Sequence, residues 1–275
     1  MTGTTQKKRI ISFDLDMTLL SHRNWKIPES AMRAWKLLRK ENILVIASGR
    51  DMNSAMSVLY RDMLKPDGII HTNGTLVEAD GRILLEHRMD KERIRRLLEY
   101  GESRKISVGT TLNGIDYYTC PEDVVYHDKY RWGESDRNFE DPWKLMELPV
   151  HTLVYIGGQE QIDNLEKEFP YMKFPVFSGK MGADIVEQEV SKAQGLLKLC
   201  QHYGIDMEQT AAFGDSMNDY EIIREAGIGV AMGNALEALK AAADYVTDDI
   251  DRDGVWKACC HFGWIQQEEA DGKTV

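Results

Sequence analysis

The sequence has few cysteines, no long apolar run and no excess of basic residues. Its 275 residues include four cysteines without C-x-x-C spacing, so the pattern does not indicate a disulfide framework or a zinc knuckle. No apolar stretch reaches the roughly 18 residues of a membrane span, and none follows the basic start of the chain as in a secretory signal. A formal net charge of -11 argues against a nucleic-acid partner, because phosphate backbones are bound by clustered lysine and arginine. We therefore expect a cytoplasmic protein that has neither a membrane nor a nucleic acid as partner; the sequence does not indicate its oligomeric state.

Both ends of the chain alternate short apolar runs with amphipathic segments. Near the start, the runs at residues 10–13, 43–47 and 68–72 predict strands, and residues 27–42 and 54–64 predict helices between them. The pattern resumes at residue 191, where Ser191 can cap a helix that Gly204 would end. Such alternation predicts an α/β fold with a doubly wound, Rossmann-like parallel sheet covered by helices on both faces.

The middle of the chain interrupts this alternation. Residues 83–189 have their own helical patterns at 90–105 and 159–169 and apolar strand patterns at 151–158 and 183–188. A structureless insertion of this length would be unusual in a compact protein. We therefore expect an inserted α+β cap domain at 83–189, with residues 1–82 and 190–275 forming a discontinuous core.

Polar residues follow the predicted core strands at the points where those strands end. Asp14, Ser48, Asn73 and Asp215 each come after a different apolar run. Ligands of open α/β sheets bind at the carboxyl ends of strands, so we expect these side chains to converge on one crevice. Asp14 and Asp16 would point to the same side, roughly 7 Å apart. Paired carboxylates raise each other's pKa, which implies a bound cation, a shared proton or catalytic work.

Each of these residues also has a purely structural interpretation. Aspartates and the Ser48-Gly49-Arg50 and Asn73-Gly74 segments are common in turns, and Asp215, Ser216 and Asn218 could cap a helix. Lys192 alone would be read as a solvated surface lysine. Their joint occurrence at several strand ends favours the catalytic interpretation.

Three other patterns do not carry a site. Residues 249–254 match the first half of a calcium loop, but Cys260 stands where its bidentate glutamate belongs. Residues 227–233 have the wrong glycine spacing for a dinucleotide fingerprint. No H-E-x-x-H pair is present among the seven histidines, so a zinc site is not expected.

Four segments resemble, in order, the four motifs of the haloacid dehalogenase (HAD) superfamily: "DLDMT" (14–18), "ASGR" (47–50), "SKAQGL" (191–196) and "GDSMND" (214–219). The long insertion, together with "NG" at 73–74 and "AMGNA" at 231–235, resembles the Cof-type branch, subfamily IIB. The resemblance covers essentially the whole chain. Two positions depart from the pattern, because Met17 stands where glycine is usual and Ser48 where threonine is common.

The resemblance implies a phosphatase that works through an aspartyl-phosphate. Asp14 would attack phosphorus, and Asp16 would protonate the leaving alcohol and then activate water. Ser48 and Asn218 would bind the phosphoryl oxygens, and Lys192 would neutralise charge.

The resemblance also implies a metal and a substrate class. Mg²⁺ would be held by the side chains of Asp14 and Asp215 and the main-chain oxygen of Asp16. Asp219 would orient the metal site or Lys192 without binding the ion. Gly49, Arg50 and Asn73 would face the substrate, a small phosphorylated metabolite such as a sugar phosphate, a nucleotide or a coenzyme phosphate. A phosphomutase of sugar phosphates and a non-catalytic sensor of phosphorylated metabolites stay open as alternatives.

Overall fold

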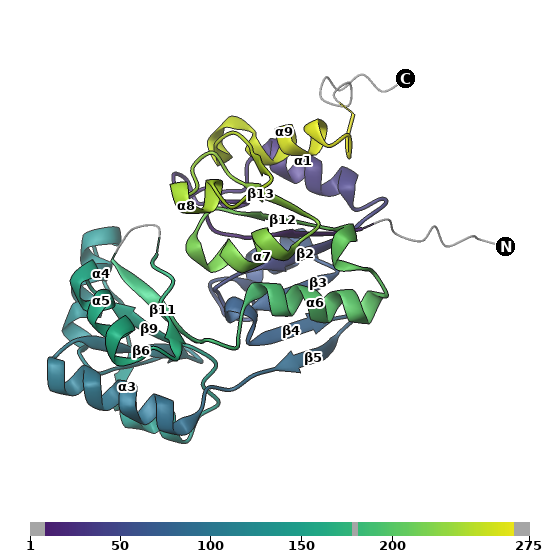
Figure 1. Ribbon diagram of the computed structural model, residues 1–275. Coiled ribbons are helices and arrows are strands. Elements are labelled where there is room, and N and C mark those ends of the chain that lie inside the picture. The colour runs from purple at the N-terminus through teal and green to yellow at the C-terminus, as the bar shows by residue number, and fades with distance from the viewer. Residues whose placement is uncertain (1–8, 178–180, 267–275) are drawn as a thin grey trace. The chain divides into compact units, whose positions relative to one another are not determined.

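The computed structural model describes residues 9–177 and 181–266, and of residues 131 and 132 only the backbone. The described chain divides into two compact units, drawn in Figure 1. The first unit contains the described residues up to Asn53, residues 57–85 and those from Ser191 onward, and the second contains residues 86–190 with 54–56. Each unit has its own apolar core, as expected for separate domains. No helix among the described residues is long and apolar enough to cross a membrane.

The first unit is built on one sheet, whose eight strands within the described residues follow the order β14-β13-β12-β1-β2-β3-β4-β5. Their bounds are β1 (Ile10–Phe13), β2 (Ile43–Ala47), β3 (Gly68–His71), β4 (Leu76–Ala79), β5 (Arg82–Glu86), β12 (Thr210–Gly214), β13 (Ile228–Ala231) and β14 (Tyr245–Val246). Neighbours from β14 to β3 are parallel, which confirms the predicted α/β class. β4 is antiparallel to β3, so the sheet is mixed at one edge and not parallel throughout.

The position of β1 in the middle of the sheet explains why its sequence is an apolar run. Its four residues are wholly buried or nearly so, since strands in the middle of a two-sided sheet have no solvent face. Phe13 pairs in register with Phe213 of β12 and with Ile46 of β2. The residues that follow these three strands therefore leave the sheet at the same edge, where the candidate site residues lie.

Helices cover both faces of this sheet (Figure 1). On one face α1 (Glu29–Leu38) packs beside α9 (Gly254–His261), and on the other α6 (Lys192–Tyr203) packs beside α7 (Tyr220–Glu225). The predicted bounds of α6 are confirmed, because the Ser191 hydroxyl accepts the Gln194 N–H at its start and Gly204 is left-handed after its end. The remaining α-helices among the described residues of this unit are α2 (Val58–Leu64) and α8 (Glu237–Lys240).

The second unit contains a sheet with the order β10-β11-β9-β6-β7-β8. Its strands are β6 (Ser107–Leu112), β7 (Ile115–Tyr118), β8 (Phe139–Glu140), β9 (Leu153–Ile156), β10 (Met172–Lys173) and β11 (Gly182–Glu187), and its helices are α3 (Lys91–Arg104), α4 (Pro121–Trp132) and α5 (Gln159–Glu168). Neighbouring strands of this sheet are antiparallel, except that β7 and β8 are parallel. β5 lies in the first sheet, so the chain leaves the first unit after Leu85 and not after residue 82.

Arg137 joins two buried carboxylates inside the second unit. Its guanidinium donates to Asp116 at 3.0 Å and to both oxygens of Asp128 at 2.6 and 3.0 Å. Burial alone would raise the pKa of Asp128, but the hydrogen bonds and charge of Arg137 lower it below the usual value. Arg137 thus fixes the segment after α4 to β7 through a paired, hydrogen-bonded charge.

We predict that Arg137→Met destabilises the second unit by roughly 3–5 kcal/mol, because it leaves two buried carboxylates without their cation. Hydrogen exchange of peptides from β6 and β7, followed by mass spectrometry, should report the loss of protection. Lys144→Met, which removes an exposed lysine paired with Glu140, is the control and should leave that exchange nearly unchanged. Equal protection in Arg137→Met and the native chain would contradict the prediction.

Candidate active site

A fully buried lysine links two carboxylates at the carboxyl edge of the first sheet. Lys192, the first residue of α6, donates from Nζ to Asp14 Oδ1 and to Asp219 Oδ1, both at 2.7 Å. Its side chain has no exposed surface. Burial alone would lower the pKa of Lys192, but the charges of Asp14 and Asp219 raise it, so the lysine stays protonated. The interpretation of Lys192 as a solvated surface residue is therefore wrong.

A glycine allows the start of α6 to approach the loop after β3. Gly74 closes the short 3-10 turn η1 (Thr72–Gly74) with φ +101°. A Cβ at this position would lie 2.1 Å from the carbonyl oxygen of Ser191. Only glycine fits there, and the close approach places Lys192 where Asp14 can reach it.

Asp215 and Asp219 come from the loop that follows β12. Asp215 Oδ1 accepts a hydrogen bond from Thr18 Oγ1 at 3.3 Å. Asp219 ends the 3-10 turn η4 (Met217–Asp219), and its Oδ2 accepts the backbone N–H groups of residues 215 and 216 at 3.1 and 3.2 Å. Because Lys192 takes its other oxygen, Asp219 is fully engaged in holding the loop and the lysine.

With all its carboxylates ionised, the site would carry more negative charge than its lysine can balance. One carboxylate oxygen from each of Asp14, Asp215 and Asp219 lies within 4.8 Å of the others, and all three residues are buried. Burial raises the pKa of Asp14 to about 8 although Lys192 opposes the rise. Burial, followed by the charge of Asp14, also raises the pKa of Asp215 well above its usual value. A hard cation would offset this charge, and the all-oxygen donor set is one that Mg²⁺ accepts.

Asp16 lies in a different environment from Asp14. Its carboxylate accepts hydrogen bonds from Arg50 Nε at 2.6 Å, Arg50 Nη2 at 2.5 Å and His22 Nε2 at 2.6 Å. Burial alone would raise the pKa of Asp16, but hydrogen bonds from His22 and Arg50 outweigh it and lower the value to about 2. Asp16 is therefore an anchored, ionised carboxylate in this conformation.

Hydrogen bonds connect the loops after β2 and β3 with each other and with the turn η4. The Ser48 hydroxyl accepts the N–H of Arg50 at 3.0 Å, and its carbonyl accepts the N–H of Asn73 at 3.0 Å. Asn73 is left-handed, and its Oδ1 accepts from Asn218 Nδ2 at 2.9 Å. Gly49 lies between Ser48 and Arg50 in the loop after β2. These contacts bring Ser48, Arg50, Asn73 and Asn218 to one edge of the first unit.

Three contacts at this edge were not anticipated from the sequence. Thr18 and His22 bind the carboxylates described above, and Asn234 donates to the carbonyl of Met17 at 2.8 Å. Thr18 and Asn234 lie inside quoted motifs, whereas nothing in the sequence marked His22. Met17 has φ 58°, a left-handed conformation that costs a residue with a Cβ about 1–2 kcal/mol, which explains the usual glycine.

The fold and this site define a family. A model of the haloacid dehalogenase-like hydrolases matches residues 11–259, and the chain belongs to that family. Within it the chain is a phosphatase of the Cof-type branch, in agreement with the relatives below.

Three similar proteins match this chain over nearly their full lengths. The chain is 29% identical over 271 residues to YkrA of Bacillus subtilis, named as a candidate phosphatase, with 94% of this chain and 99% of that protein covered. It is 26% identical over 256 residues to the 5-amino-6-(5-phospho-D-ribitylamino)uracil phosphatase YcsE of the same organism, covering 92% and 95%. The solved structure of BT4131, described as a HAD subclass IIB sugar phosphatase, has a TM-score of 0.83 and 27% identity and covers 94% and 100%.

We predict that Lys192→Met lowers the free energy of unfolding of the first unit by roughly 3–5 kcal/mol, because Asp14 and Asp219 lose the cation they share. Lys198→Met, the same change on the same helix, is the matched control and should have little effect. Urea unfolding followed by tryptophan fluorescence provides the measurement. Equal midpoints for the two variants would show that the buried pairing does not stabilise the unit.

We predict that Gly74→Ala lowers the unfolding temperature at least twice as much as Gly81→Ala. Both glycines have positive φ, so both variants carry the left-handed strain of about 1–2 kcal/mol. A Cβ at residue 81 meets nothing within 4 Å, whereas at residue 74 it meets the Ser191 backbone. Calorimetry compares the two. Similar shifts would mean that α6 can move away without loss.

Proposed function

We propose that the protein is a cytoplasmic, Mg²⁺-dependent phosphatase that hydrolyses a small phosphorylated metabolite through a phosphate ester on Asp14. The observation that carries the proposal is the buried Lys192 shared by Asp14 and Asp219 beside Asp215. A structural ion pair would need one carboxylate for one lysine. A surplus of buried carboxylates at the carboxyl edge of the sheet is instead typical of a phosphoryl-transfer site with a cation.

The two oxygens of Asp14 support its role as nucleophile. Lys192 binds Oδ1 at 2.7 Å, which leaves Oδ2 to attack phosphorus. In the first step a bond forms between Oδ2 and phosphorus while the bond from phosphorus to the alcohol oxygen breaks. In the second step water attacks the phosphorus and releases Asp14 with inorganic phosphate. Lys192, Ser48 and Asn218 would stabilise the negative charge on the transferring group.

Asp16 would move the protons in both steps. Its ionised state suits the second step, in which a carboxylate takes a proton from water. In the first step it must give a proton to the leaving alcohol. That role requires Asp16 to exchange its contacts with Arg50 and His22 for the oxygen of the leaving group.

Mg²⁺ would be bound by the carboxylates of Asp14 and Asp215 and the main-chain oxygen of Asp16. When bound, it would neutralise charge shared by these carboxylates and the phosphate. Asp219 is already saturated by Lys192 and two backbone N–H groups, so it would orient the site without binding the ion.

The names of two relatives support the proposed substrate class. YcsE is named for a phosphorylated ribitylamino-uracil, and BT4131 is described as a sugar phosphatase. The substrates in these names are small phosphomonoesters, which favours the same class of substrate for this protein. The second unit, which lacks the motifs of the site, would act as the cap that selects the alcohol part of the substrate and excludes water.

We predict that Asp14→Asn lowers phosphate release by roughly a thousandfold or more, because the amide cannot act as the nucleophile. A panel of sugar, nucleotide and coenzyme phosphates with Mg²⁺ provides the assay, and Asp62→Asn, which changes an exposed aspartate, is the control. Chelation should stop turnover by the native protein, and added Mg²⁺ should restore it.

The other outcomes point elsewhere. Full activity of Asp14→Asn would exclude Asp14 as nucleophile, and turnover after chelation would exclude the metal. Transfer of phosphate between sugar positions without release would identify a phosphomutase. Binding of a phosphorylated metabolite by the native protein without any turnover would identify a sensor.

A further inference from the structure

The second unit contains a pocket that the proposed chemistry does not use. It has a volume of about 270 Å³ and lies between α4 and the segment from the end of β9 to Gly158. We call it the α4 pocket; its lining residues are Asp123, Tyr126, His127, Tyr155, Ile156, Gly157, Gly158 and Met181. All of them belong to the second unit. The volume suits a small molecule and not a polymer segment.

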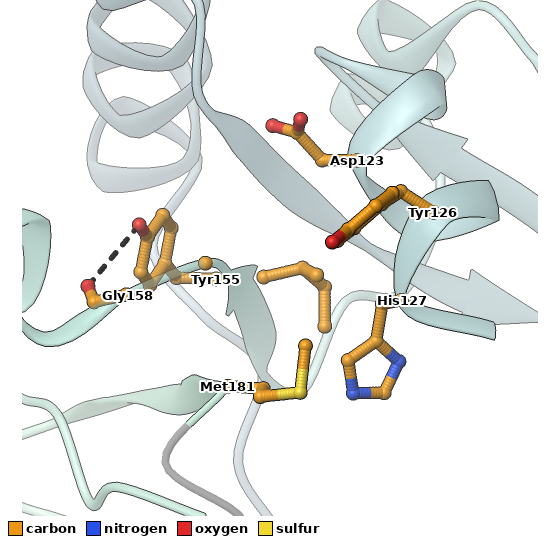
Figure 2. A pocket seen from close by; sticks show the side chains of 8 residues that line it. Asp123, Tyr126, His127, Tyr155, Gly158 and Met181 are labelled. Atoms are coloured by element: carbon orange, nitrogen blue, oxygen red, sulfur yellow. Dashed lines mark hydrogen bonds between the residues drawn. The ribbon is translucent and has the colours of Figure 1, made fainter. Parts of the chain in front are cut away.

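Apolar and aromatic side chains form its walls. Figure 2 shows Tyr126 of α4 and Tyr155 of β9 on opposite sides, with Met181 and His127 at another edge. Tyr155 is nearly fully buried, and its hydroxyl donates to the carbonyl of Gly158 at 3.4 Å, which holds the ring in place. Tyr126 is 67% exposed, so its ring is available to a ligand. Two aromatic side chains facing one space favour a flat ring as occupant.

Asp123 gives the pocket a negative charge. It occupies the first turn of α4, where a carboxylate commonly folds back to cap the helix, yet α4 has no side-chain cap hydrogen bond. No described residue forms a hydrogen bond or ion pair with the Asp123 carboxylate. Burial, and then the neighbouring charge of Glu122, raises the pKa of Asp123. Asp123 is one of the lining residues, and its charge adds to burial in raising the pKa of Tyr155 to about 12.

The opposite rim exposes bare backbone. A Cβ at Gly157 would lie 2.1 Å from the Tyr155 hydroxyl, so no side chain can stand there. A Cβ at Gly158 would meet nothing within 4 Å. The ligand can therefore approach the main chain closely on this side.

We propose that the α4 pocket binds the flat ring of a small molecule that carries a protonated amine or a similar N–H donor. The ring would stack on the exposed ring of Tyr126, opposite the buried Tyr155, and the cationic group would pair with Asp123. A cation would provide a partner for Asp123, whose carboxylate has none among the described residues, and it also favours the faces of tyrosine rings. A simple sugar has neither an aromatic ring nor a cationic group, and a carboxylate would be repelled by Asp123 and Glu122.

Such a group could belong to the alcohol part of the phosphorylated substrate or to a separate effector. The first source rests on the proposed phosphatase function, whereas binding to the pocket does not. Binding is therefore measured with ligands that carry no phosphate, and also in Asp14→Asn, where turnover is absent. The pocket proposal is then tested by binding of the probes, and the catalytic proposal is tested separately by phosphate release.

Three matched probes test the chemistry on the full-length protein: 2-phenylethylamine, 2-phenylethanol and 2-cyclohexylethylamine. The first carries a flat aromatic ring and a positive charge, and the second carries the aromatic ring without the charge. The third carries the charge on a ring that is not flat. Ligand-observed NMR titrations should give the amine with the flat ring about tenfold higher affinity than either of the others. Asp123→Asn should remove that advantage over the alcohol, and Tyr126→Ala should weaken both phenyl compounds. Tyr130→Ala, one turn along α4, 72% exposed and outside the lining, should change nothing.

Contrary results would overturn the proposal. Equal affinities of the amine and the alcohol, or an unchanged preference in Asp123→Asn, would exclude the cation site, and no binding by any probe would exclude the pocket. Circular dichroism checks that each variant is folded. Given binding, the effect of 2-phenylethylamine on phosphate release separates the sources: a raised KM at constant kcat identifies the substrate's own group, and a changed kcat identifies an effector.

Discussion

The ion pair of Lys192 with Asp14 and Asp219 is the interaction on which the first unit depends. It joins the end of the central strand, the start of α6 and the loop after β12, which are far apart in the sequence. Buried ion pairs are expensive to desolvate and seldom stabilise more than apolar packing would. With three buried carboxylates around one lysine, the arrangement is poorly suited to stability alone. Its persistence is easier to understand if a divalent cation completes the charge balance.

The hydrogen-bond partners of each carboxylate separate supporting groups from reactive ones. Both carboxylate oxygens of Asp219 accept hydrogen bonds from protein donors, and the Asp16 carboxylate is bound by Arg50 and His22. Asp14 and Asp215 are less satisfied, and burial raises the pKa of both. Buried carboxylates with few hydrogen-bond donors from the protein are typical of sites where a ligand binds.

Much of the first unit could be predicted from the sequence, for physical reasons. Strands buried on both faces appear as unbroken apolar runs, and Ser191 and Gly204 mark α6 at both ends. The second unit was harder, because α4 carries buried His127 and Asp128 among exposed tyrosines and so lacks an apolar stripe. The contact of His22 with Asp16 and the place of Asp123 in the α4 pocket depend on side-chain directions that no local pattern specifies. The roles of the site residues in catalysis stay predictions.

The pairing of β1 with β12 constrains how this chain can mature during its synthesis. Ile10 is hydrogen-bonded beside Thr210, so the central strand waits for one neighbour until the ribosome has made some two hundred further residues. The second unit, in contrast, is almost contiguous and has its own core, so it can finish folding while the first is still half exposed. The apolar strands β1 to β3 are therefore the part of the nascent chain that most needs protection from misassociation, and slow translation beyond residue 190 would prolong that exposure.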